Sequence, residues 1–302
     1  MSELALRILF SVVAAPLALF VVLAGGAPLA ALLAVVSALG AWEFYRIARG
    51  SDTRPLDDVG IAVAGLLPLA VHAHYLGLFM VGLSLAAVVA LAVLAATIWL
   101  RGVEGRPLGA AAVTLLGVAY TAGMLSYGYA IRYHDVVRGY DAVAAPFASL
   151  GPLDVPIAPG GVLLIFPLVL TWASDIGAYF VGRAIGGRKL IPSVSPGKTV
   201  AGAVGGLVVC MVVSWLYARS VLVPVASLGF TPWAALGFGA LISVAAQVGD
   251  LFESLLKREG GVKDSSRIIP GHGGILDRFD SLIFVLPVAY LLLGWLPIPI
   301  VR

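Results

Sequence analysis

Residues 79–100 read FMVGLSLAAVVALAVLAATIWL, a run of 22 residues without a charged side chain. An α-helix needs about 20 such residues to cross the hydrocarbon core of a bilayer. Similar runs recur along the chain, which is 61% hydrophobic and 12% charged, whereas soluble domains are about 25% charged. The sequence therefore predicts a protein embedded in a membrane.

We expect about nine transmembrane helices in one polytopic, all-α integral membrane bundle. Strands are not expected, because lipid cannot satisfy an open sheet edge and these runs are too long and too uniformly apolar for barrel strands. The predicted spans are residues 6–24, 28–48, 59–77, 79–100, 109–131, 161–182, 199–219, 233–256 and 280–298. Within this continuous membrane domain we expect an N-terminal scaffold over 1–131, an outer loop over 132–160 and a C-terminal region over 161–302 whose spans carry polar residues.

The basic residues follow the positive-inside rule. If the N-terminus lies inside the cell, 15 of the 19 Lys and Arg residues fall in inner segments. We therefore expect a protein of the plasma membrane, the inner membrane in bacteria. Its N-terminus and its most densely charged segment are expected on the cytoplasmic side, where nucleotides are found.

That charged segment, residues 249–281, reads GDLFESLLKREGGVKDSSRIIPGHGGILDRFDS and holds six of the chain's 16 carboxylates. Apolar runs flank it, and charges at membrane depth are costly, so it marks a functional site by default. Acidic and basic residues in near balance, spaced by glycines, favour metal ions and phosphate over an apolar ligand. Salt bridges on a solvated loop are the alternative interpretation.

In this segment, spacings of three and four residues place the charged side chains on common helix faces. Asp250, Glu253 and Lys257 fall on one helix face, and Asp277 and Asp280 repeat the pattern at the start of the next helix. The glycine-rich stretch between the two helices predicts a tight turn whose backbone can approach a ligand closely. Two helix ends joined in this way can aim four carboxylates at one point, which suits Mg²⁺.

A second constellation, residues 171–202, reads TWASDIGAYFVGRAIGGRKLIPSVSPGKTVAG. Asp175 lies inside a predicted span, where a carboxylate indicates function, with a helix-packing hydrogen bond as the alternative. Its spacing puts it on or near one helix face with Tyr179, Gly182 and Arg183. The basic, glycine-rich loop that contains Arg183 and Lys198 suits phosphate, with a positive-inside anchor as the alternative. Gly197-Lys198-Thr199 is similar to the end of a P-loop, but the rest of that motif is absent and we exclude a P-loop NTPase.

Two shorter patterns predict local packing. Glu43 stands three residues before Arg46 near a span end, which favours an ion pair between them. Gly202 and Gly206 form a small-xxx-small pair, which predicts close packing of the seventh span against another helix.

The charged segment resembles the C-terminal motif of the phosphatidate cytidylyltransferases, the CDP-diacylglycerol synthases. The matching residues are Ser254-Leu-Leu-Lys257-Arg258, Lys263-Asp264 and His272-Gly273-Gly274-Ile-Leu-Asp277-Arg278-Phe-Asp280. Ser174-Asp175 and Ser195-Pro-Gly-Lys198-Thr199 are similar to the family's second conserved loop. The resemblance covers residues 160–290 well and upstream rests on hydropathy and span count. The family usually has Glu before Gly where this chain has Ala201.

The resemblance implies that CTP and phosphatidic acid react to give CDP-diacylglycerol and pyrophosphate in phospholipid biosynthesis. The lipid phosphate is already an anionic nucleophile, so metal ions and fixed cations must neutralise charge and align the attack. The resemblance also implies Mg²⁺ as the cofactor, and a second, monovalent cation is compatible with it. Membrane lipid surrounds the protein, a homodimer is compatible with the packing motifs, and no nucleic-acid partner is expected.

The roles implied for individual residues fall into three groups. The catalytic residues are Asp250, Lys257, Asp277 and Asp280. The metal ligands are Asp250, Asp277 and Asp280, followed by Asp175 and Glu253. The residues expected to bind substrate are Ser174, Arg183, Ser195, Lys198, Thr199, Arg258, Lys263, His272, Gly273, Gly274 and Arg278.

Three other classes of function compete with this interpretation. A CDP-alcohol phosphatidyltransferase also uses carboxylates on membrane helices, but its spaced aspartate pattern is absent here. A cation-coupled transporter would favour inverted repeats and a midplane site, whereas these charges gather at one membrane face. A lipid-binding structural protein would not require the dense acidic segment.

Overall fold

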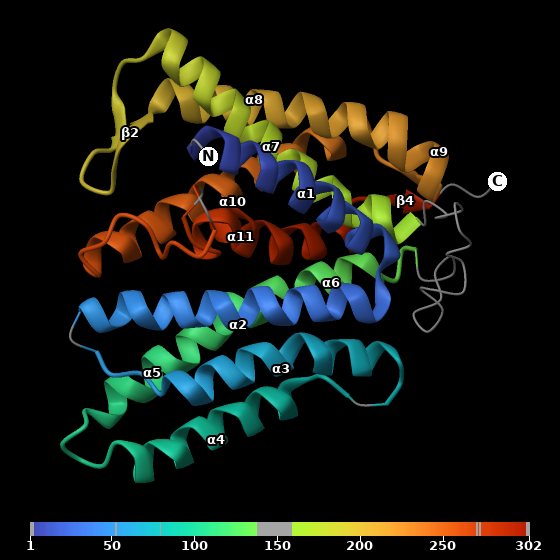
Figure 1. Ribbon diagram of the computed structural model, residues 1–302. Helices are drawn as coiled ribbons and strands as arrows, with labels where there is room; N and C mark the ends of the chain where they lie inside the picture. The colour runs from blue at the N-terminus through green and yellow to red at the C-terminus, as the bar shows by residue number, and fades with distance from the viewer. Residues whose placement is uncertain are drawn as a thin grey trace. The chain divides into compact units, whose positions relative to one another are not determined.

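The computed structural model describes residues 3–51, 53–78, 80–137, 159–269, 271 and 273–299, and this part of the chain is mainly helical (Figure 1). The helices are α1 (Glu3–Ala24), α2 (Gly26–Gly50), α3 (Asp57–Tyr75), α4 (Leu83–Leu100), α5 (Pro107–Val118), α6 (Tyr127–Arg132), α7 (Pro159–Ile185), α8 (Val200–Tyr217), α9 (Val223–Ala226), α10 (Pro232–Glu259) and α11 (Leu276–Leu293). Two π-helical turns, η1 (Ala119–Gly123) and η2 (Ala218–Leu222), continue α5 and α8.

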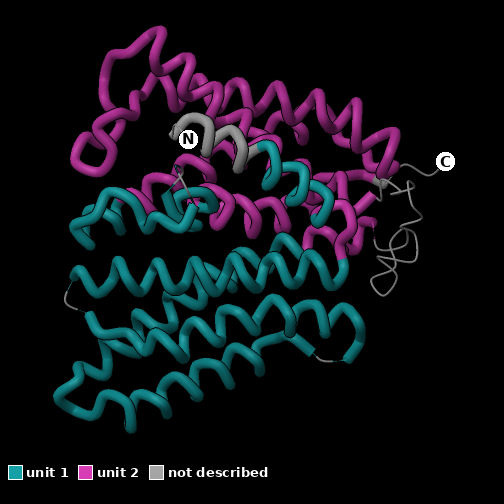
Figure 2. Tube along the Cα trace, in the orientation of Figure 1, with its two compact units in different colours: residues 1–21, 26–129, 255–279 teal, residues 22–25, 130–254, 280–302 magenta. Residues whose placement is uncertain are grey.

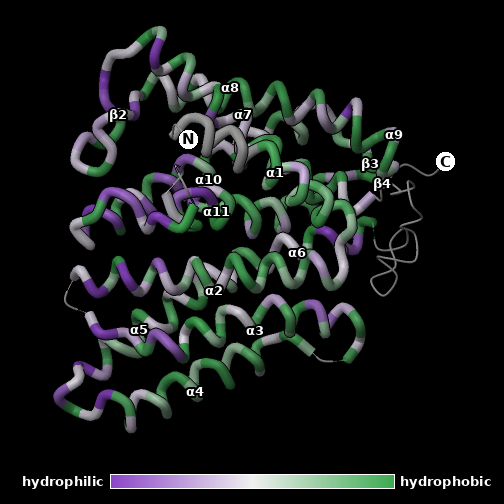
Figure 3. Tube along the Cα trace, viewed as in Figure 1, coloured by the Kyte–Doolittle hydropathy of each residue, from purple (hydrophilic) through white to green (hydrophobic). Residues whose placement is uncertain are grey.

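Every predicted span coincides with a helix, which confirms the all-α membrane architecture. Within the described residues, seven helical segments are long and apolar enough to cross a membrane: 26–50, 57–75, 83–100, 107–132, 159–185, 200–226 and 232–259. The helix α11 differs because its first turns carry Asp277, Arg278 and Asp280. Figure 3 shows hydrophobic residues along most of α4 and hydrophilic ones at the loop that follows α7.

No strands were expected, but short strands are present in the loops and near the C-terminal end. Strands β1 (Lys189–Ile191) and β2 (Ser195–Thr199) form an antiparallel hairpin between α7 and α8, and β3 (Leu228–Gly229) pairs with β4 (Ile298–Pro299). In the hairpin the Val194 N–H donates to the Ile191 carbonyl at 3.1 Å. Proline at the second position of a turn is pre-set for this geometry, and Pro192 provides it.

The chain forms two compact units, shown in different colours in Figure 2. Unit 1 contains residues 1–21, 26–129 and 255–279, and unit 2 contains 22–25, 130–254 and 280–302. The division at 131 and 160 expected from the sequence stays a prediction; residues 255–279 belong to the same compact unit as the N-terminal helices. Within the predicted outer loop, residues 138–158 lie outside the described part of the chain.

Unit 1 is built around α2, which packs on α3 and α5. Tyr45 of α2 is fully buried, and its hydroxyl donates to the Thr114 carbonyl of α5 at 2.8 Å. A side chain at Gly60 of α3 or Gly117 of α5 would collide with the Tyr45 ring. Glycine at these two positions therefore lets three helices close on one aromatic side chain.

Unit 2 is built around the pair α7 and α8. A Cβ atom at Gly202 would lie 2.7 Å from the Ala178 carbonyl oxygen, and one at Gly206 would lie 2.7 Å from that of Ser174. Real side chains do not approach this closely, so the backbones meet only because both residues are glycine. The close packing predicted from the Gly202/Gly206 pair is confirmed, and its partner is α7.

Candidate active site

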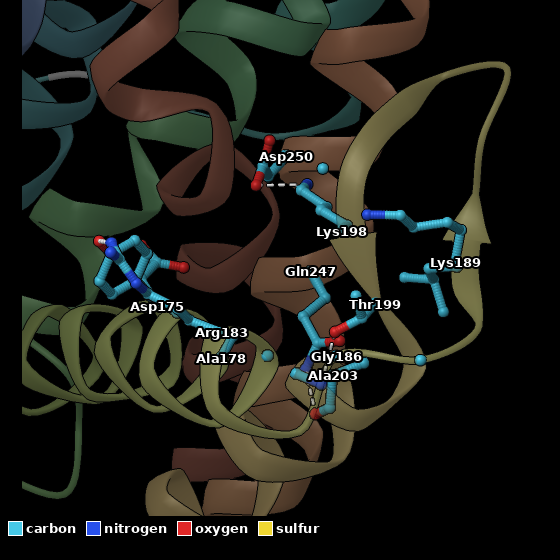
Figure 4. Close-up of a pocket in the computed structure, with 16 residues that line it drawn as sticks. Asp175, Ala178, Arg183, Gly186, Lys189, Lys198, Thr199, Ala203, Gln247 and Asp250 are labelled. Atoms are coloured by element: carbon cyan, nitrogen blue, oxygen red, sulfur yellow. Dashed lines mark hydrogen bonds and ion pairs between the residues drawn. The ribbon is translucent and has the colours of Figure 1, made fainter.

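A cavity of about 710 Å³ lies in unit 2 between α7, the β1–β2 hairpin, α8 and α10 (Figure 4). We call it the unit 2 pocket. It is lined by Asp175, Ala178, Tyr179, Gly182, Arg183, Gly186, Gly187, Lys189, Leu190, Gly197, Lys198, Thr199, Gly202, Ala203, Gln247 and Asp250. Two carboxylates, three basic side chains and several glycines therefore face one volume, which suits a phosphorylated ligand.

One face of helix α7 contributes an acidic and a basic side chain to the pocket. Asp175, Tyr179, Gly182 and Arg183 follow the three- and four-residue spacing that places side chains on the same side of a helix. The Arg183 guanidinium donates to the Tyr179 hydroxyl at 2.9 Å. The spacing read from the sequence thus brings Asp175 and Arg183 together, as expected.

The hairpin places Lys198 against Asp250 of α10. The two form an ion pair, and their side chains keep 29% and 33% of their surface exposed. Figure 4 shows Lys189 of β1 reaching toward Lys198. Thr199 lines the pocket and caps α8, where its hydroxyl accepts the Gly202 N–H at 3.1 Å. Residues from two distant segments of the sequence thus share one site.

Three lining residues with polar side chains were not among the expected site residues: Tyr179, Lys189 and Gln247. The Gln247 amide donates to the Ala203 carbonyl at 3.1 Å and to the Ser243 hydroxyl at 3.0 Å, so it ties α10 to α8. An amide inside an apolar span was the signal that could have identified Gln247. Lys189 stood in the basic loop but outside the motif that resembles the family.

A second charged cluster lies in unit 1. The Lys257 ammonium donates to Asp277 Oδ1 at 2.7 Å, and their side chains are only 14% and 8% exposed. Asp277 Oδ2 accepts the Ser265 N–H at 3.0 Å, the Ser265 hydroxyl at 2.9 Å and the Gly274 N–H at 2.8 Å. Burial alone would raise the pKa of Asp277, but these donors, Lys257 foremost, lower that pKa to about 2.

The tight turn predicted between α10 and α11 is present in unit 1. The Ile269 N–H donates to the Gly273 carbonyl at 2.9 Å, and Gly271 and Gly273 have φ angles of +74° and +82°. Only glycine adopts this left-handed region without strain, which explains their positions. His272, expected to bind substrate, lies outside the described residues.

The other expected site residues divide by exposure and by unit. Ser174 is buried, shares a 2.7 Å hydrogen bond with Ser243 and does not line the pocket. Glu253 is also fully buried. In unit 2, Ser195 begins β2 outside the lining, and Asp280 accepts the Ser281 N–H at 2.6 Å. In unit 1, the basic side chains expected to bind substrate are exposed: Arg258, Lys263 and Arg278.

The metal assignment stays a prediction. Among the residues that the structure describes, no group of three or more His, Cys, Asp or Glu side chains is arranged to hold a metal ion. Asp175 and Asp250 nevertheless fit a hard cation, because both face the unit 2 pocket and Asp250 already accepts the Lys198 ammonium. Asp280 belongs to the same unit, and its carbonyl oxygen lies 2.6 Å from where a Cβ on Gly249 would stand.

Glu43 corrects one sequence prediction. Its carboxylate is fully buried and accepts hydrogen bonds from Ser265, Ser266, Ile275 and Leu276. The expected partner, Arg46, instead lies 5.7 Å from the centre of the Trp42 ring. The ion-pair prediction was wrong because it considered only neighbours along one helix. A carboxylate inside a predicted span was the signal for a more distant partner.

Comparison with known proteins gives consistent matches. A family model described as "Cytidylyltransferase family" matches residues 5–296. A Bacillus subtilis protein named phosphatidate cytidylyltransferase is 46% identical over 136 residues, which cover 45% of this chain and 48% of the relative. A protein of the same name from Brucella suis is 37% identical over 183 residues, covering 58% and 66%. The chain thus spans about half to two thirds of the length of the curated relatives it matches.

Proposed function

Because this chain belongs to the cytidylyltransferase family, we propose that it transfers the cytidylyl group of CTP to phosphatidic acid, giving CDP-diacylglycerol and pyrophosphate. The relatives named above support the choice of lipid substrate. The observation that carries the proposal is the unit 2 pocket, where two carboxylates and three basic side chains line one cavity among long apolar helices. Family membership also favours this reaction over a transporter or a CDP-alcohol phosphatidyltransferase.

In the proposed reaction, an oxygen of the lipid phosphate attacks the α-phosphorus of CTP, and the bond to pyrophosphate breaks. Both partners are anions, so the main task of the site is to offset their repulsion and hold them in line. Arg183, Lys189 and Lys198 provide fixed positive charge around the pocket. No side chain needs to act as the nucleophile, because the phosphate itself does.

We propose that Asp175 and Asp250 hold Mg²⁺ in this pocket. When bound, Mg²⁺ would neutralise phosphate charge and help to orient the reacting groups. The Lys198–Asp250 ion pair lies in the lining of the pocket and its side chains are half-buried, so Lys198 can turn to a phosphate in the pocket when Asp250 takes another cation. The expected roles of Asp277, Asp280 and Glu253 as metal ligands, and the binding of a monovalent cation, stay predictions.

The lipid substrate is expected to approach along α7. Trp172, Ile176 and Phe180 expose 60%, 56% and 64% of their surface and follow a four-residue spacing on this helix. Asp175 and Tyr179, on the adjacent face, line the pocket. Acyl chains that lie on the apolar face would bring a phosphate head group to the pocket. With 15 of 19 basic residues in inner segments, we place the pocket on the cytoplasmic side of the membrane.

The proposal is tested with the purified full chain in detergent. Labelled CTP, dioleoyl phosphatidic acid and Mg²⁺ should yield CDP-diacylglycerol and pyrophosphate in equal amounts. Omitting phosphatidic acid, or replacing it with diacylglycerol, should abolish both products, and a chelator should do the same until Mg²⁺ is restored. Pyrophosphate without CDP-lipid, or turnover unaffected by the chelator, would contradict the lipid substrate or the metal respectively.

A further inference from the structure

One face of α2 contacts the turn that joins α10 to α11. Gly40, Glu43, Ile47 and Gly50 are separated by three, four and three residues, which places them on one side of the helix. Each of them approaches the segment 255–279, and all these residues belong to unit 1. The N-terminal region therefore contributes a docking face for the charged motif near the C-terminus.

Two of these contacts depend on glycine. A Cβ atom at Gly260 would lie 2.7 Å from both the Cγ2 atom and the carbonyl oxygen of Ile47, and one at Gly50 would collide with the Gly260 carbonyl. At the other end of the face, a Cβ at Gly40 would stand 3.4 Å from the Leu276 side chain. The motif is thus held against α2 at both ends, with Glu43 between them.

The Glu43 carboxylate is saturated with donors from the motif. Oε1 accepts the Ser266 hydroxyl at 2.5 Å and the Ile275 N–H at 2.8 Å. Oε2 accepts the Ser265 hydroxyl at 2.8 Å and the Leu276 N–H at 2.7 Å. A buried charge is tolerated only when it is hydrogen-bonded in this way. Each oxygen therefore holds one serine hydroxyl and one backbone N–H.

The two backbone donors stand at the start of α11. Helical N–H groups at this end have no partner within their own helix, and the helix dipole favours a negative charge there. Glu43 supplies that charge from a different helix. Ser265 then links it to Asp277, because the Ser265 hydroxyl lies within hydrogen-bond distance of both carboxylates. Asp277 in turn holds Lys257.

Gly274 shows how closely Glu43 fits the turn. A Cβ atom at Gly274 would collide with the Ser265 hydroxyl and with the Glu43 carboxylate. The residue is buried, and its own N–H is held by Asp277 at 2.8 Å. Even one methyl group would therefore push Glu43 away from the motif.

We propose that Glu43 is a positioning residue for cytidylyl transfer: it holds the Gly273–Gly274 turn and the Asp277–Lys257 pair, to which the sequence analysis gives roles in substrate binding and catalysis, in one conformation. This inference rests on the proposed function for its kinetic consequence, but the contact itself does not. Glu43 touches no reacting group. It acts through the backbone of Ile275 and Leu276 and through Ser265.

Glutamine is the most informative replacement for Glu43, because it keeps the shape of the side chain but no longer has two equivalent acceptor oxygens. The amide has one acceptor oxygen and one donor NH₂ group. In either orientation, the NH₂ group faces a backbone N–H, that of Ile275 or that of Leu276. A donor then opposes a donor in a buried place, so the turn must shift.

The test compares Glu43→Gln with wild type in detergent by hydrogen exchange and by kinetics. We expect faster exchange in peptides that cover 265–279 and unchanged exchange in the β1–β2 hairpin. We also expect kcat/KM for CTP to fall about 100-fold, the effect of a small misplacement of catalytic groups. Thr97→Val is the matched control, because Thr97 is also a buried polar residue of unit 1, but its hydroxyl donates to the Val93 carbonyl of its own helix and not to the segment 265–279.

Each result decides one part of the inference. Unchanged exchange over 265–279 in Glu43→Gln overturns the contact, and faster exchange with wild-type kcat/KM overturns the positioning role. If Glu43→Gln does not fold, Ser266→Ala replaces it, because it removes one donor to Oε1 and leaves the carboxylate in place. If wild type itself shows no CTP turnover, the proposed function fails, while the exchange experiment still decides whether Glu43 holds the turn.

Discussion

Two of the charged pairs in the described part of the chain differ in how much of their side chains is exposed. Lys198 and Asp250, in the unit 2 pocket, expose 29% and 33% of their side chains, whereas Lys257 and Asp277, in unit 1, expose 14% and 8%. A half-buried pair exchanges partners at a lower cost than a buried pair with every acceptor occupied. Unit 2 therefore offers groups that a phosphate or a cation can take, while unit 1 uses its charges to fix a turn.

The largest expected effect is on the stability of unit 1. Asp277→Asn leaves the Lys257 ammonium buried without its carboxylate, which should lower the free energy of unfolding by about 3–5 kcal/mol. Chemical unfolding in detergent measures this loss. Asp250→Asn, which breaks the more exposed of the two pairs, should cost less, about 1 kcal/mol. Equal losses in the two variants would remove the distinction between the pairs.

The next expected effect is on activity, where Asp250 should matter more than it does for stability. Asp250→Asn should lower kcat for CDP-diacylglycerol formation by about 10²–10³-fold, the usual effect of removing one charge-stabilising group, with little change in unfolding. Glu104→Gln, at an exposed carboxylate in the turn after α4, is the control and should keep wild-type turnover. Near-normal activity in Asp250→Asn would exclude this carboxylate from the reaction.

The Asp277 cluster also predicts a dependence of stability on acid pH. Its carboxyl has a pKa of about 2 in the folded chain, below the ordinary value of 3.8. The ionised form therefore stabilises the fold above pH 4, and this contribution, about 2–3 kcal/mol, is lost as the pH falls toward 2. Unfolding measured from pH 6 to pH 2 should show this loss in wild type and a smaller one in Asp277→Asn. Parallel curves would contradict the assignment.

The smallest expected effect concerns the rim of the unit 2 pocket. Lys189→Ala should raise KM for CTP about fivefold, because an exposed charge contributes about 1 kcal/mol or less, and should leave kcat nearly unchanged. Arg188→Ala is the matched control, since Arg188 is the adjacent basic residue and does not line the pocket. If both variants raise KM equally, the hairpin acts only through its net charge.

Much of the fold was predictable because lipid restricts the backbone. Runs of about 20 apolar residues can only be helices in a bilayer, so each predicted span coincides with one. Local spacing also predicted that Asp175 and Arg183 share a face, and that Gly202 and Gly206 permit close packing. These features depend on residues within one or two helical turns.

The remaining features depend on contacts between distant segments. Glu43 and Ser265 are 222 residues apart, and no local spacing rule selects that partner over the nearby Arg46. The β1–β2 hairpin was missed because the membrane constraint on strands does not apply to a hydrated loop. The pairing of Lys257 with Asp277 likewise depends on how the turn between α10 and α11 folds back.

The central claim is that the unit 2 pocket carries cytidylyl transfer to phosphatidic acid. Its most direct test is mass spectrometry of CDP-diacylglycerol made by the purified full chain and by the double variant Lys198→Ala/Asp250→Asn, with both proteins shown to unfold at similar denaturant concentrations. We predict product from wild type and none above background from the double variant. Comparable product from both, or none from wild type with CTP, Mg²⁺ and phosphatidic acid present, would contradict the claim.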